Sequence, residues 1–147
     1  MKTNLKIATV ALAMALSAPA MAEENKSPIV GAWQMKSLEI AAADGTYSNI
    51  PYSGQVIFTE SGTLSVQAAN ANRNAEDTTY TLQGYEAYYG PVVVDDKAGT
   101  FTITVGSSLV RAHEGQSLVR KFDVTDDKLV ITPVDASEGW RVTYHRQ

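Results

Sequence analysis

From Pro28 onward the chain alternates apolar and polar residues in short runs, and residues that form turns end each run. A period of two is typical of strands with one buried face, and links of hairpin length favour antiparallel neighbours. The eight expected strands cover residues 30–40, 54–59, 63–68, 88–95, 100–105, 117–124, 128–134 and 140–146. This pattern predicts an all-β fold, either a closed barrel or two stacked sheets. Closure would remove the exposed sheet edges, which otherwise need protection.

Two segments interrupt the alternation. In residues 69–87, apolar side chains fall at helical spacing at Leu82, Tyr85 and Tyr88 or Tyr89. Asn74 and Asp77 are residue types that begin helices, so we expect one short helix between the third and fourth strands. The threonines and the glycine of this segment disfavour that helix. Residues 106–116 are expected to form a long polar loop.

The N-terminal segment has the pattern of a cleaved signal peptide. Lys2 and Lys6 precede an apolar run, residues 7–16, that is too short to span a bilayer. Ala20-Met21-Ala22 then supplies small residues where a signal peptidase cuts. Cleavage after residue 22 would leave 125 residues and change the formal charge from −4 to −6. We therefore expect a periplasmic protein, without a lipid anchor because no cysteine follows the cleavage point.

Composition excludes several functional classes. The remaining residues, 23–147, have the length of a single domain. The chain has no cysteine, so it has no thiol nucleophile and no cysteine-based metal site. Twelve basic against 16 acidic residues argue against a nucleic-acid partner. The two histidines, His113 and His145, lie on separate elements, so we expect no metal site. No nucleotide-binding or nucleophile-elbow motif is present, and we expect no cofactor.

The sixth expected strand places a charge among apolar side chains. Leu118, Phe122 and Val124 define its apolar face, and Arg120 lies on the same face. A buried guanidinium cannot lose its proton and is costly unless it is paired. Two interpretations remain open. Either Arg120 is satisfied by a carbonyl, a tyrosine or a carboxylate of the protein, or it contacts a polar or anionic group of a ligand.

Further candidate ligand-binding residues lie near the expected mouth of the fold. Tyrosine combines a large apolar face with a hydroxyl that needs a partner when it is buried. Arg111 and His113 lie on the long loop, where they either contact a ligand or are solvated like most loop residues. With Arg120, the candidates are Tyr85, Tyr88, Tyr89, Arg111 and His113. The tyrosines could also simply fill the interior.

The chain resembles the short bacterial and fungal lipocalin-like domain family. The resemblance is carried, in order, by Gly31-Ala32-Trp33-Gln34-Met35, residues 58–67, Ala87-Tyr88-Tyr89-Gly90, residues 95–102 and Leu118-Val119-Arg120-Lys121-Phe122. It implies an eight-stranded antiparallel up-and-down β-barrel with a central cavity and no general cofactor. In lipocalins the first-strand tryptophan packs against an arginine near the chain end, and Trp33 and Arg146 fit these positions as structural residues that close the barrel.

Three functions remain open, because barrels of this kind have many functions. The leading hypothesis is a periplasmic protein that binds a small hydrophobic or amphipathic ligand in the barrel cavity. The alternatives are a small enzyme, such as an isomerase, cyclase or hydrolase acting inside the cavity, and a structural or interaction protein with a filled barrel. The last includes a homodimer.

Overall fold

The structure, a computed structural model, describes residues 26–147. The predicted signal peptide, residues 1–22, lies outside the described residues and stays a prediction. Within residues 26–147 no helix has both the length and the apolar character needed to cross a membrane.

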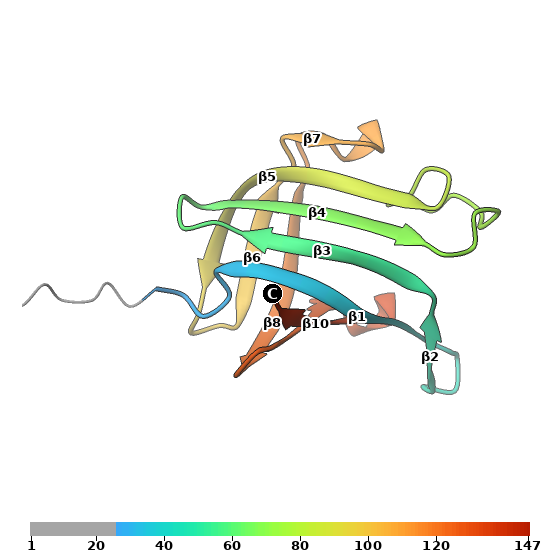
Figure 1. Cartoon of the computed structure of the whole chain (residues 1–147), viewed down its shortest axis with the longest axis horizontal. Coiled ribbons are helices and arrows are strands. Elements are labelled where there is room, and N and C mark those ends of the chain that lie inside the picture. The colour runs from blue at the N-terminus through green and yellow to red at the C-terminus, as the bar shows by residue number, and fades with distance from the viewer. Residues whose placement is uncertain (1–25) are drawn as a thin grey trace, which may run out of the picture.

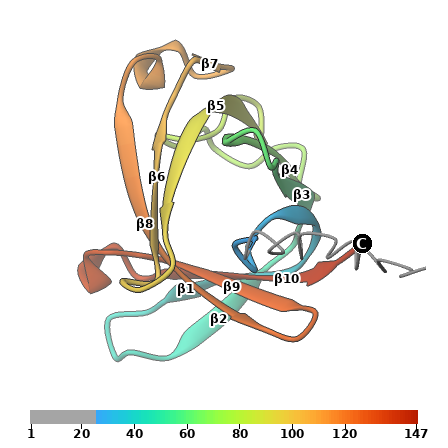
Figure 2. The ribbon, with the colours of Figure 1, turned by 90° about the vertical axis from the view of Figure 1, so that its left-hand side faces the viewer.

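Eight antiparallel strands close into a barrel (Figure 1). They are β1 (Gly31–Ala41), β3 (Tyr52–Phe58), β4 (Thr63–Asn70), β5 (Tyr85–Asp95), β6 (Thr100–Thr104), β8 (Ser117–Thr125), β9 (Lys128–Pro133) and β10 (Trp140–Arg146). Each strand pairs with the next in this series, and β10 returns to pair with β1. Figure 2 shows β6 and β8 on one side of the barrel and β3 and β4 on the other. The predicted all-β, eight-stranded up-and-down barrel is confirmed.

Short elements decorate the barrel. The strand β2 (Tyr47–Ile50) folds back on β1 before Pro51 leads into β3. The two-residue strand β7 (Ser107–Ser108) pairs with β5, inside the segment that the sequence predicted as a loop. Two 3₁₀ turns occupy Arg111–His113 and Ala136–Glu138.

The predicted short helix between the third and fourth barrel strands is wrong. The chain there forms turns, because its polar side chains satisfy the backbone locally. The hydroxyls of Thr78 and Thr81 accept hydrogen bonds from backbone N–H groups within the segment. Leu82 and Tyr85 then exchange backbone hydrogen bonds across a tight turn, in which Gln83 has a φ of 52°. As a result β5 begins at Tyr85, ahead of the predicted start at Tyr88.

The apolar residues of the alternating runs point inward, as expected of strands with one buried face. Phe101 and Ile103 on β6, Leu129 on β9, and Val142 and Tyr144 on β10 are all buried in one core. On β8, burial alternates from residue to residue, and Arg120 lies on the inner face. On these strands, the period of two identifies the side chains that face the interior.

One end of the barrel is closed around Trp33, which has no exposed surface. The indole N–H of Trp33 donates to the Ile29 carbonyl at 2.8 Å. The guanidinium of Arg146 lies 4.0 Å from the centre of the Trp33 ring and donates to the carbonyls of Val30 (3.0 Å) and Pro28 (2.8 Å). The arginine thereby ties the chain end to the segment that enters β1.

Gly90 on the curved strand β5 (Figure 1) lies close to the backbone at the end of β6. A Cβ atom at Gly90 would overlap the carbonyl oxygen of Thr104 and lie 2.8 Å from the nitrogen of Gly106. Both are backbone atoms, so neither can move aside without shifting the main chain. We expect Gly90→Ala to lower the free energy of unfolding by about 1–3 kcal/mol, as overpacking does. Urea denaturation measures this.

Gly106→Ala is the matched control for that substitution. Its Cβ would approach no described atom closer than the Tyr89 carbonyl oxygen at 3.4 Å. We expect a change within about 0.5 kcal/mol, as for most benign surface substitutions. Equal destabilisation by the two alanines would show that the close approach at Gly90 is not what matters.

Candidate functional site

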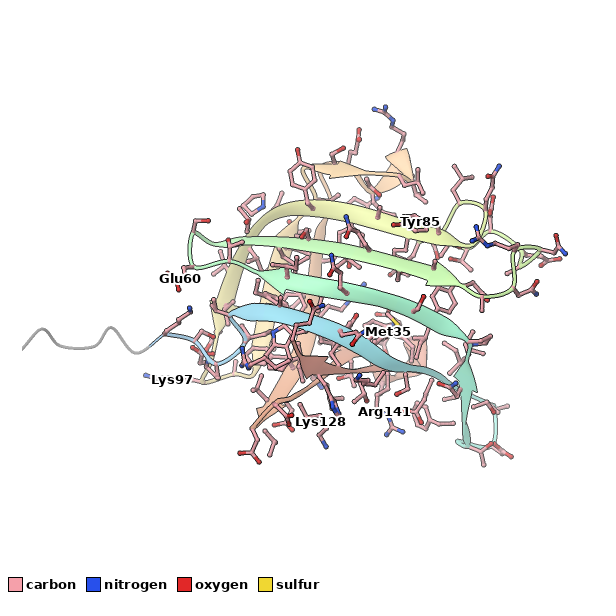
Figure 3. The ribbon with its side chains drawn as sticks, in the orientation of Figure 1. Met35, Glu60, Tyr85, Lys97, Lys128 and Arg141 are labelled. Carbon is pink, nitrogen blue, oxygen red and sulfur yellow. The ribbon has the colours of Figure 1, made fainter. Side chains whose placement is uncertain are left out.

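The interior of the barrel holds a cavity of about 350 Å³. Its wall is mainly apolar and is built from the inward faces of several strands. The lining residues include Met35 on β1 (Figure 3), Val66 on β4, Phe101 on β6 and Val142 on β10. Glu76 and Thr78 also line it, and their segment lies at the end of the barrel far from the start of the described chain (Figure 1). The cavity therefore lies toward the end opposite Trp33 and Arg146.

Arg120 reaches the cavity from the inner face of β8. Its Nη2 donates to the hydroxyl of Tyr80 and its Nη1 to the carbonyl of Val119, each at 3.0 Å. Its guanidinium lies 5.2 Å from the Trp140 ring centre and 5.9 Å from the Tyr80 ring centre. No carboxylate forms an ion pair with Arg120 among the described residues. Protein groups thus accept two hydrogen bonds from Arg120, and its contact with a ligand stays a prediction.

Glu86 is a cavity residue that the sequence analysis missed. It lies on the inner face of β5, lines the cavity with Arg120, and forms no hydrogen bond or ion pair with any described residue. Burial raises the pKa of the Glu86 carboxyl from its ordinary 4.5 to about 7, and the charge of Arg120 opposes part of that rise. Near neutral pH this carboxyl is therefore divided between its charged and neutral forms.

The predicted tyrosines are divided between the two faces of β5. Tyr88 points inward and lines the cavity, and burial raises the pKa of its phenol well above the ordinary value. Burial does the same to the pKa of Tyr144 on β10. Both phenols keep their protons at physiological pH. Tyr85 and Tyr89 have the opposite parity, are 43% and 58% exposed, and do not line the cavity.

His113 and Arg111 also lie outside the cavity wall. His113 is buried, its Nε2 donates to the carbonyl of Thr79, and its ring stacks on Tyr80 with centres 5.0 Å apart and planes 3° apart. Arg111 is exposed and pairs with Glu114 at 3.6 Å. His113 thus supports the back of the tyrosine whose hydroxyl binds Arg120. A chain of contacts runs from the 106–116 segment through Tyr80 to the cavity.

Within residues 26–147 there is no group of three or more His, Asp or Glu side chains placed to hold a metal ion. The polar groups of the cavity wall are instead one guanidinium, two carboxyls, the amide of Asn70, two threonine hydroxyls and several phenols. Such a set can bind and orient an organic molecule through hydrogen bonds inside an apolar enclosure.

The chain is similar to lipocalin-like proteins in sequence and in fold. The family described as "Lipocalin-like domain" matches residues 30–143. A lipocalin-like protein from Bacteroides uniformis, known from a crystal structure, is 16% identical, with a TM-score of 0.50 over 80% of this chain and 97% of that one. A point mutant of the fluorescent protein UnaG is 10% identical, with a TM-score of 0.39 over 80% and 95% of the two chains. No curated protein matches the sequence.

Proposed function

Because the chain belongs to the lipocalin-like domain family, we propose that it is a periplasmic protein that binds a small hydrophobic or amphipathic molecule in its barrel. The observation that carries this proposal is the cavity of about 350 Å³. A barrel of eight strands can be filled by its own side chains or can hold one small ligand. The cavity supports the second possibility, because the aromatic rings of the interior do not fill it.

The shape and chemistry of the cavity support a binding role. Its volume lies within the range of roughly 300–1,000 Å³ that is usual for ligand pockets, at the lower end. Apolar walls bind a ligand through hydrophobic contacts, which do not fix its orientation. The few polar groups fix that orientation through hydrogen bonds. Arg120 is held in place by Tyr80 and Trp140, so it does not have to be ordered when a ligand binds. The periplasmic part of the proposal is supported by the signal-peptide pattern of residues 1–22.

Native mass spectrometry of the protein purified from the periplasm of its own host tests this proposal. We expect a mature chain that begins at Glu23 and retains a small molecule when sprayed from a non-denaturing buffer. Val66→Trp places an indole in the cavity and should abolish retention, whereas Val93→Trp, the same change on the outer face of β5 at a residue that is 75% exposed, should not.

Two results would contradict the binding role. One is a wild-type protein that retains nothing and also binds no hydrophobic probe. The other is a Val66→Trp protein that retains the molecule as well as wild type does. Circular dichroism of both tryptophan variants establishes that each still forms the barrel. If Val66→Trp does not fold, Met35→Phe is a smaller change that narrows the same cavity.

A further inference from the structure

Two oppositely charged groups line the cavity without pairing with each other. Arg120 on β8 and Glu86 on β5 both line it, yet no ion pair joins them. A buried charge usually has a partner, because an unpaired one is costly. Both groups therefore line the same cavity without forming an ion pair, so a ligand in that cavity can contact both.

The hydrogen-bonding capacity that remains defines what would fit there. Arg120 has five N–H donors and uses one for Tyr80 and one for Val119, so three stay available. Glu86 uses neither oxygen on a described residue. The complement of this pair is a ligand edge that carries a hydrogen-bond acceptor for Arg120 beside a donor for Glu86.

We infer that the cavity takes an uncharged ligand whose polar end presents an acceptor and a donor side by side, as an amide or a lactam does, and discriminates against the corresponding carboxylate. This inference rests on the proposed binding function and specifies its ligand class. The amide carbonyl accepts from Arg120, and its N–H donates to the Glu86 carboxylate. No net charge has to leave water when such a ligand binds.

The titratable and charged surroundings of Glu86 determine how a carboxylate ligand would behave. The groups that line the cavity with it are Arg120, Glu76, Tyr52, Tyr80, Tyr88 and Tyr144. Tyr88 and Tyr144 do not ionise near neutral pH, because burial raises the pKa of each phenol. A carboxylate ligand would meet a second carboxylate when Glu86 is ionised. It would meet a hydrogen-bond donor when Glu86 is protonated. Glu86 changes between these two forms near pH 7, because burial raises the pKa of its carboxyl to about 7.

Three probes with the same apolar body separate these cases: 2-naphthamide, methyl 2-naphthoate and 2-naphthoate. Titration calorimetry of each at pH 6 and pH 8 gives their dissociation constants. At pH 8 we expect the amide to bind about tenfold more tightly than the ester, which lacks the donor, and than the carboxylate. Between pH 6 and pH 8 the affinity for 2-naphthoate should fall about tenfold, because one proton on Glu86 is linked to its binding.

Glu86→Gln identifies the group responsible. A glutamine stays neutral and still carries a donor, so the variant should bind 2-naphthoate equally at pH 6 and pH 8, and more tightly than wild type at pH 8. Glu60→Gln is the matched control, since Glu60 is exposed in the β3–β4 turn at the other end of the barrel (Figure 3). That variant should keep the pH dependence of wild type.

The possible failures are distinguishable. If 2-naphthoate binds as tightly as the amide at pH 8, or if its pH dependence survives in Glu86→Gln, the inference is wrong and the binding function stands. If the amide does not bind while the native protein retains some other molecule, the ligand class is wrong. If no probe binds and nothing is retained, the proposed function itself is contradicted.

Discussion

Replacing Trp33 with alanine should lower the free energy of unfolding by about 3–5 kcal/mol, the usual cost of deleting a buried aromatic side chain. Trp33 has no exposed surface, and its indole N–H is bound to the Ile29 carbonyl. Its removal would also take away the ring against which the Arg146 guanidinium lies. The entry of the chain into β1 would then be held by the hydrogen bonds from Arg146 alone. Urea denaturation of residues 23–147 measures the difference.

Trp140→Ala is the matched control, because it removes the same side chain at the opposite end of the barrel. Trp140 is half-buried, lines the cavity and has its N–H bound to the Glu138 carboxylate at 3.2 Å. We expect a smaller loss of stability there, together with weaker binding of any cavity ligand. A Trp33→Ala protein no less stable than Trp140→Ala would show that the closed end does not depend on the stacked pair.

The sequence predicted the environment of a residue correctly where that environment depended only on the residue's position in a strand. Arg120 was placed inside the barrel because Leu118 and Phe122 flank it at a spacing of two, and the structure has it there. The rule was not applied to the tyrosines of β5, because Tyr85 and Tyr88 or Tyr89 fall at helical spacing and were assigned to a helix. Once the start of β5 at Tyr85 is known, Tyr88 and Glu86 share the inner face, and Tyr85 and Tyr89 share the outer one.

The rest depended on contacts between segments that are far apart in the chain. His113 was predicted on a polar loop, yet its ring is buried against Tyr80 and its Nε2 reaches the carbonyl of Thr79, 34 residues away. No local pattern signals such a contact. The missing helix is a different case, since threonine hydroxyls that compete for backbone hydrogen bonds already disfavoured it in the sequence.

The stability of the wild-type protein should fall as pH rises from 4.5 to 7, because of Glu86. Burial raises the pKa of this carboxyl to about 7 in the folded protein, against 4.5 for an ordinary glutamate. In that interval the folded chain holds a proton that the unfolded chain has released, so raising the pH favours unfolding. A shift of this size corresponds to a loss of about 3 kcal/mol across the interval. The contribution is fully present below pH 4.5 and is lost by the time pH has passed through 7.

Glu86→Gln isolates this effect, because the contributions of the groups that the two proteins share cancel in the difference between their free energies of unfolding. Urea denaturation at intervals from pH 4 to pH 8 measures the free energy of unfolding of each protein. The two values should be equal at pH 4, and the difference between them should grow as the pH rises. By pH 8 the glutamine variant should be the more stable protein by up to about 3 kcal/mol.

Below pH 4.5 other carboxyls determine how stability depends on pH. A hydrogen bond from Arg141 lowers the pKa of Glu39, and hydrogen bonds from Thr46 lower the pKa of Asp44. Both proteins therefore lose stability together as these carboxylates become protonated. A constant difference from pH 4 to pH 8 would mean that Glu86 titrates like an exposed glutamate. The cavity would then have to be wetter around this residue than its apolar walls imply.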